Sequence, residues 1–249
     1  MVTIRVRCLL VLFGLLAVSL FGGSAAMADG FTPKQRAEII AIVRDALKQD
    51  PSILRDAVTA LQADESAQAQ ASARAALTRM QDKLVSPDDP VAGNPHGDVT
   101  IVEFFDTRCP YCRKIEPVME EFLRHDPNVK LVYKDLPILG PASVLGSKAL
   151  IAAQKQGGYE KLRNLVMKLP PDTTLVQIQA AAEKAGLDWP RLARDMEDPS
   201  VKARIDQNLA LAHALEIQGT PALVIGKQII PGAVDVNDLK EAVAAARKG

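Results

Sequence analysis

Two cysteines three positions apart are the residues of this chain whose types and spacing most clearly carry chemistry. They lie in the run Cys109-Pro110-Tyr111-Cys112. Two thiols at this spacing can form and break a disulfide with each other, and a thiolate is the species that attacks another disulfide. A disulfide that closes so short a loop contributes little to stability by loop-closure entropy. We therefore expect the two cysteines to have a chemical role.

A pair of cysteines can also be part of a metal site. Zinc normally takes about four Cys or His ligands. The remaining cysteine, Cys8, lies near the N-terminus, and the histidines His96, His125 and His213 are scattered. The sequence therefore indicates no zinc site. A soft ion such as Cu(I) can be held by two thiolates alone, so a copper-binding or copper-tolerance protein stays open as an alternative.

The elements around the cysteines decide how they can react. Residues 99–105 form an apolar run typical of a buried strand, and a helical pattern follows from about Pro110 to His125. Cys109 is therefore expected at a helix N-terminus, where unpaired backbone N–H groups and the helix dipole stabilise an anion. Pro110 suits the first helical turn because it has no N–H to lose. Cys112 lies one turn further along and should be more buried.

Glu103 is the second residue of interest. Because side chains alternate along a strand, Glu103 shares a face with Val99, Ile101 and Phe105. An acid among apolar neighbours is expected to be partly buried, with a raised pKa. From a place beneath the cysteines it could exchange a proton with Cys112. The alternative is an ordinary carboxylate paired with a lysine at the edge of the sheet.

Thr220 and Pro221 lie just before a predicted strand. A proline at that point cannot supply a backbone N–H to the sheet. A cis bond between them would turn the backbone of Thr220 outward, where it could pair with an extended substrate. Taken alone, the two residues favour a trans bond, because cis is the minority form of X–Pro bonds.

The remaining pattern from residue 87 onward alternates strands and helices. A second strand is expected over 129–134, helices from about 142 to 217, a hairpin over 221–225 and 228–230, and a last helix from about residue 236. This order predicts an α/β domain over residues 87–249 with a helical insertion at about 140–217.

The segment before this domain, residues 29–86, is expected to be helical. Thr32, Pro33 and Gln35 fit a capped helix start, and Asp50-Pro51 should end the first helix. An apolar stripe and a long Ala- and Gln-rich helix predict either a segment that pairs with copies of itself or a helical linker. The stripe consists of Ile39, Val43 and Leu47.

The first 28 residues have the pattern of a secretory signal. Two arginines precede an apolar stretch, and the segment closes on Ala26-Met27-Ala28. We therefore expect cleavage after Ala28 and export to the periplasm. The 249-residue chain has 30 basic and 30 acidic residues, a formal net charge of zero. Such a balance argues against nucleic acid as a partner.

The run from Glu103 to Cys112 closely resembles the active-site region of DsbA-type thioredoxin-fold oxidoreductases. The resemblance covers about residues 91–248 and includes Gly219-Thr220-Pro221, where that family has its cis-proline loop. Residues 31–85 are similar to the N-terminal segments of ScsC-like (suppressor of copper sensitivity) and Com1-like proteins. The resemblance implies a thioredoxin-like fold with a helical insertion.

The resemblance also implies roles for the site residues. Cys109 would be the nucleophile, Cys112 the resolving cysteine and Glu103 the family's buried acid. The substrate-binding residues would be Thr220 and Pro221, together with Pro110 and Tyr111. No cofactor is implied beyond the redox-active disulfide Cys109–Cys112.

The function implied is an exported protein thiol–disulfide oxidoreductase or isomerase. Threonine before the cis-proline, and Pro-Tyr between the cysteines, look more like the isomerase-type relatives. Expected partners are cysteine-containing exported client proteins, a membrane redox partner that recycles the cysteines, and further copies of the chain in a homotrimer through the N-terminal helices. Thr107-Arg108 departs from the aromatic residue that relatives often carry there, which leaves substrate preference open.

Overall fold

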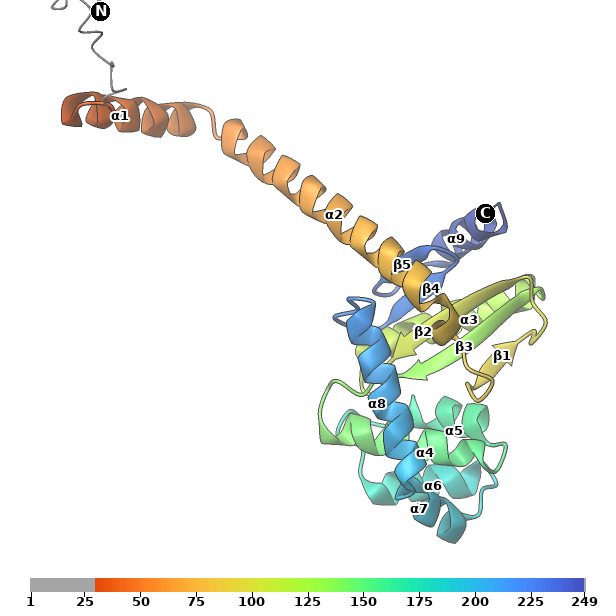
Figure 1. Ribbon diagram of the computed structural model, residues 1–249. Coiled ribbons are helices and arrows are strands. Elements are labelled where there is room, and N and C mark those ends of the chain that lie inside the picture. The colour runs from red at the N-terminus through yellow and green to blue at the C-terminus, as the bar shows by residue number, and fades with distance from the viewer. Residues whose placement is uncertain (1–29, 249) are drawn as a thin grey trace, which may run out of the picture. The chain divides into compact units, whose positions relative to one another are not determined.

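The computed structural model describes residues 30–248, and Figure 1 shows their helices and strands. The chain divides into two compact units, and the boundary in the sequence lies between Gln62 and Ala63. The expected signal peptide and Cys8 lie outside the described residues. Between residues 30 and 248, no helix is both long enough and apolar enough to cross a membrane.

The N-terminal segment is helical, as predicted. Helix α1 covers Pro33–Gln49 and α2 covers Ser52–Leu84, with the expected break at Asp50-Pro51. The backbone N–H of Gln35 donates to the hydroxyl of Thr32 at 3.3 Å, and the side chain of Gln35 accepts from the N–H of Thr32 at 2.9 Å. This reciprocal capping confirms the predicted helix start. Helix α1 has no buried residue, so its apolar stripe is exposed.

The described strands form one five-stranded sheet in the order β1-β3-β2-β4-β5. The central strands β2 and β3 are parallel, and the other neighbouring pairs are antiparallel. The strands are β1 Val91–Gly93, β2 Val99–Phe105, β3 Val129–Asp135, β4 Ala222–Ile225 and β5 Gln228–Pro231. The predictions for β2, β3 and the β4–β5 hairpin are confirmed. Strand β1 was not predicted, because its three residues lie between turn-forming segments.

The helices also follow the predicted order, including the long insertion between β3 and β4. The helix after β2 is α3, Pro110–His125, as predicted. Figure 1 shows the insertion helices α4 to α7 gathered on one side of the sheet, close to α8. The remaining helices are α4 Pro141–Gln154, α5 Tyr159–Val166, α6 Leu175–Lys184, α7 Trp189–Met196, α8 Pro199–Ala214 and α9 Val236–Arg247.

The sheet is covered on both faces, since alternate side chains of β2 belong to two different apolar clusters. Ile101 and Phe105 pack with α3, α9 and the helical insertion. Val102 and Phe104 pack with α8 and with the end of α2, where Leu77 is buried. This end of α2 thus belongs to the same compact unit as the sheet. A domain division near residue 86 remains a prediction.

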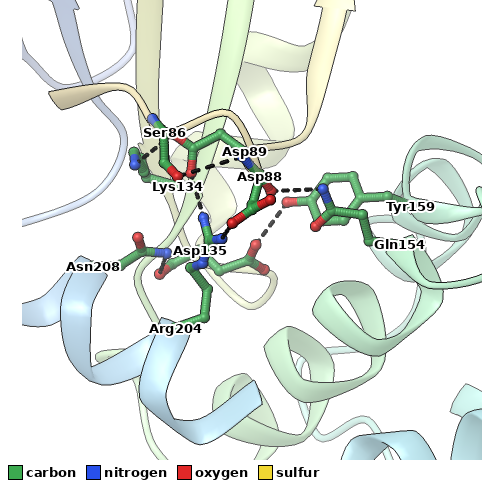
Figure 2. Close-up of polar contacts among 9 residues, drawn as sticks. All are labelled: Ser86, Asp88, Asp89, Lys134, Asp135, Gln154, Tyr159, Arg204 and Asn208. Carbon is green, nitrogen blue, oxygen red and sulfur yellow. Dashed lines mark hydrogen bonds and ion pairs between the residues drawn. The ribbon is translucent and has the colours of Figure 1, made fainter. Parts of the chain in front are cut away.

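A buried ionic cluster fastens the chain after α2 to the sheet, as Figure 2 shows. The ammonium of Lys134 on β3 lies 2.7 Å from a carboxylate oxygen of Asp89, and the two side chains are 4% and 1% exposed. Arg204 of α8 pairs with the other oxygen of Asp89, also at 2.7 Å. Asp88 next to it is 82% exposed and lies 3.5 Å from Arg204. Burial lowers the pKa of Lys134, and Asp89 opposes that shift.

The contrast between Asp89 and Asp88 gives a stability prediction. Asp89→Asn leaves Lys134 buried without its counter-charge, and we expect it to lower the free energy of unfolding by about 3 kcal/mol or more. The control Asp88→Asn removes an exposed pair and should cost less than about 1 kcal/mol. Urea denaturation of both variants measures the difference. Equal losses of unfolding free energy in the two variants would show that the buried pair of Asp89 stabilises the fold no more than the exposed pair of Asp88 does.

Candidate functional site

The two cysteines lie where β2 passes into α3, as the sequence predicted. Cys109 is the N-cap residue of α3, and Pro110 occupies the first position of the helix. The backbone N–H of Cys109 donates to the carbonyl of Asp106 at 3.0 Å, closing the turn between strand and helix. The free N–H groups and the positive end of the helix dipole therefore lie next to Cys109.

This turn is held by Asp106, a buried acid that the sequence analysis did not single out. One oxygen of its carboxylate accepts the N–H of Arg108 at 2.8 Å. The other accepts the N–H groups of Ile138 at 2.8 Å and Leu139 at 3.0 Å. The only signal in the sequence is the preference of aspartate for accepting the N–H two residues on in a turn.

The sulfur of Cys109 lies against the loop before β4. Its thiol donates to the carbonyl of Thr220 at 3.1 Å, and Cys109 is only 4% exposed. The bond between Thr220 and Pro221 is cis. The family resemblance had implied this form, whereas the two residues taken alone favour trans. The fold thus brings together two predicted site segments that are 111 positions apart.

Cys112 lies one turn into α3 and is fully buried, as expected. The backbone N–H of Asp106 donates to its sulfur at 3.5 Å. Burial strongly raises the pKa of the Cys112 thiol. Both cysteines are present as free thiols. The two sulfurs therefore differ, since Cys109 contacts the loop carbonyl of Thr220 while Cys112 is fully enclosed.

The residues between the cysteines face outward. Tyr111 is 61% exposed, and Pro110 is also exposed. An exposed aromatic side chain beside a reactive thiol offers apolar contact area for a protein substrate. Substrate binding by Pro110 and Tyr111 remains a prediction.

Glu103 is more deeply buried than expected, with 1% of its surface exposed. Burial raises its pKa to about 7, against the attraction of Arg163. The nearest atoms of the two side chains, Nη2 of Arg163 and Oε2 of Glu103, are 3.5 Å apart. The partner of this carboxylate is thus an arginine of α5 in the helical insertion, and not a lysine at the edge of the sheet.

Arg163 is the centre of a buried group of charges and rings. It also pairs with Glu116 of α3, and its guanidinium lies 4.5 Å from the ring centre of Phe105 and 4.0 Å from that of Tyr133. The second oxygen of Glu103 has no hydrogen-bond partner among the described residues. Both Glu103 and Arg163 line a cavity of about 400 Å³ that also reaches exposed side chains. Nothing in the sequence of α5 indicated that Arg163 would face the strand.

Comparison with known families matches both parts of the chain. Residues 100–244 match the DSBA-like thioredoxin domain. Residues 35–68 match the N-terminal domain of the copper resistance protein ScsC. These ranges correspond to the α/β domain and to the first part of the predicted helical segment.

Solved structures are similar to this chain over different shares of its length. A thioredoxin-like oxidoreductase from Silicibacter pomeroyi is 43% identical, with a TM-score of 0.64, over 66% of this chain and 95% of its own. ScsC from Proteus mirabilis in a transitional conformation is 30% identical, also with a TM-score of 0.64, over 88% of this chain and 98% of its own.

Curated relatives include Na⁺/H⁺ antiporters, among them one from Salinispora tropica that is 29% identical over 65% of this chain. The chain spans about a quarter of the length of these antiporters, so the match concerns one part of them. The family match covers more than half of the chain. The chain belongs to the family of DsbA-like thioredoxin domains, with Cys109 and Cys112 as its CxxC pair.

Proposed function

We propose that the protein is an exported thiol–disulfide oxidoreductase that exchanges disulfides with client proteins, including their isomerisation. The observation that supports this most directly is the unequal setting of the two thiols at the start of α3. Cys109 is 4% exposed and contacts the carbonyl of Thr220, whereas Cys112 is fully buried one turn further into α3. An exposed client sulfur would therefore meet Cys109 first.

The proposed reaction proceeds through a mixed disulfide. The thiolate of Cys109 attacks one sulfur of a client disulfide, a new S–S bond forms, and the other client sulfur leaves as a thiolate. In isomerisation that client thiolate attacks a second client disulfide and frees a different client thiolate. This thiolate then attacks the client sulfur of the mixed disulfide, a new client disulfide forms, and Cys109 leaves as a thiolate. In reduction Cys112 attacks the sulfur of Cys109 instead, which leaves a Cys109–Cys112 disulfide and a client with two thiols.

We assign the proton of Cys112 to Glu103. Burial raises the pKa of the Cys112 thiol, so the thiol needs a proton acceptor before it can attack. Glu103 titrates near neutral pH, because burial raises its pKa to about 7. Arg163 would act as a positioning residue, since it contacts Glu103 from the side of the helical insertion.

We also propose that the N-terminal helices assemble the chain into a homotrimer. All residues of α1 are exposed, and apolar side chains continue into the first turns of α2. Exposed apolar stripes of this kind are typical of helices that pack against a partner. The match to the ScsC N-terminal domain covers this region. Further proposed partners are exported client proteins and a membrane redox protein that recycles the cysteines.

Copper binding is the second candidate function, because the matched N-terminal family is described as a copper resistance protein. Residues 35–68 of this chain contain no Cys, His or Met. Among the described residues, no group of three or more His, Cys, Asp or Glu converges as metal ligands would. The two thiols are therefore the copper site that the same experiments test.

The first experiment separates exchange chemistry from copper binding. In the chain from residue 29 onward, Cys109→Ala should slow the repair of a scrambled disulfide protein by at least about a hundredfold, because the attacking sulfur is lost. Cys112→Ala should instead trap mixed disulfides through Cys109. Stoichiometric uptake of Cu(I) by the unaltered chain, without any repair activity, would favour the copper-binding alternative.

The second experiment tests the buried acid by its effect on stability. Glu103 binds its proton more tightly in the folded chain, at about 7, than a free glutamate does at 4.5. Its stabilising contribution is therefore complete below pH 4.5 and is lost as the pH rises to about 7. Relative to Glu103→Gln, the unaltered protein should lose about 3 kcal/mol of unfolding free energy over this range.

The matched control for this titration is Glu120→Gln, an exposed acid lining the same cavity. It should keep the pH dependence of the unaltered chain, as measured by urea denaturation at a series of pH values. If Glu103→Gln also keeps that dependence, Glu103 does not titrate in the neutral range and the proposed proton transfer is wrong.

The third experiment tests assembly. Val43→Glu places a charge in the exposed apolar stripe of α1 and should convert a trimer into a monomer, because burying that charge is unfavourable. Arg44→Glu, next to it on the same helix and also exposed, is the control that should remain trimeric. Light scattering gives the masses. A monomeric unaltered chain, or a trimeric Val43→Glu variant, would contradict this assembly.

A further inference from the structure

A groove beside the reacting thiol is formed jointly by helix α2 and by the segment that leads into β4. Its volume is about 890 Å³, and all of its lining residues belong to the compact unit that begins at Ala63. One wall is the stretch of α2 that includes Ala69, Ala73 and Arg74, and the opposite side includes Pro221 and Lys227. A groove of this size can accept several residues of an extended polypeptide.

The groove adjoins the redox site through Thr220 and Pro221. Thr220 and Pro221 line it, and the carbonyl of Thr220 accepts the thiol of Cys109 at 3.1 Å. A client chain whose sulfur reaches Cys109 therefore passes the end of this groove. Strand β5, which contributes Gln228 and Ile229 to the lining, is an edge of the sheet. Edge strands and outward-facing backbone groups favour a partner in extended conformation.

The wall formed by α2 is fixed in place. The hydroxyl of Ser72 donates to the carboxylate of Glu216 at 2.7 Å, on the segment between α8 and Thr220. Just beyond, Ala76 and Leu77 are buried against the sheet. The side chains of Ala69 and Ala73 are small, so the helix leaves space at the wall rather than filling it.

The charges of the groove are unbalanced. Arg74 and Lys227 line it, and neither forms an ion pair with any residue between 30 and 248. The lining contains one acid, Glu216, which accepts a hydrogen bond from the neutral hydroxyl of Ser72, so the cations of the lining outnumber its acids by two to one. Two cations without partners favour an occupant that carries carboxylates.

We propose that this groove binds the client polypeptide next to its reacting cysteine, in extended form, and prefers client segments rich in Asp and Glu. The inference rests on the proposed exchange function and adds a role for α2 within it. Helix α2 then forms part of the substrate site, in addition to its proposed role in assembling the homotrimer.

The test compares two disulfide substrates in the chain from residue 29 onward. One is a peptide whose cysteine is flanked by acidic residues and is bonded to a small thiol, and the other is bis(2-hydroxyethyl) disulfide, which is too small to occupy the groove. In the double variant Arg74→Glu/Lys227→Glu, the ratio of kcat/KM for the acidic peptide to that for the small disulfide should fall by about tenfold. For a matched peptide with lysines, this ratio should rise.

A second variant tests the shape of the groove independently of its charge. Ala73→Trp places a large ring at the wall and should lower the same ratio for both peptides. The controls are Arg79→Glu and Ala75→Trp, exposed positions of α2 outside the groove lining, and both should keep the ratio of the unaltered chain.

The outcomes distinguish failure of the groove proposal from failure of the proposed exchange function. If the unaltered chain reduces the small disulfide but the groove variants leave the peptide ratios unchanged, the groove proposal is overturned and the exchange function stands. If the unaltered chain reduces neither substrate, both fail. Equal effects of the groove variants and their controls would also overturn the proposal, since the effect would then not depend on the groove.

Discussion

The tight turn between β2 and α3 is the constraint on which the rest of the site depends. The buried carboxylate of Asp106 accepts N–H groups from Arg108 on one side and from Ile138 and Leu139 on the other. It thereby fixes the start of α3 directly at the end of a buried strand. Cys109 is the N-cap of that helix, and Cys112 is fully buried one turn later. The difference between the two thiols follows from this geometry.

Two buried ionic clusters connect the helices to the sheet, and they serve different purposes. Around Asp89, full pairing of Lys134 and Arg204 ties the segment after α2 to β3 and α8. Around Arg163, the pairing is incomplete, because one oxygen of Glu103 has no partner among the described residues. The incompletely paired Glu103 is also the acid whose pKa burial raises to about 7. This difference is why we assign proton transfer to Glu103.

The sequence predicted the elements better than the contacts between distant residues. The capped start of α1, the strand β2 and the helix α3 follow from local periodicity and from Thr32, Pro110 and the apolar runs. Strand β1 was missed because three residues carry no period. The partner of Glu103 was missed because Arg163 lies 60 positions away and its own helix shows no sign of it. The groove was missed for the same reason, since α2 and Thr220 are distant in the chain.

In the proposed reaction Cys109 is the attacking sulfur, and Cys112 reacts only in a later step. Timed alkylation of the reduced protein with iodoacetamide at neutral pH, followed by mass mapping of the two cysteine peptides, tests this directly. We expect label on Cys109 at least about ten times faster than on Cys112, because Cys109 caps the helix N-terminus while burial raises the pKa of the Cys112 thiol. Equal labelling of the two cysteines, or faster labelling of Cys112, would contradict the account.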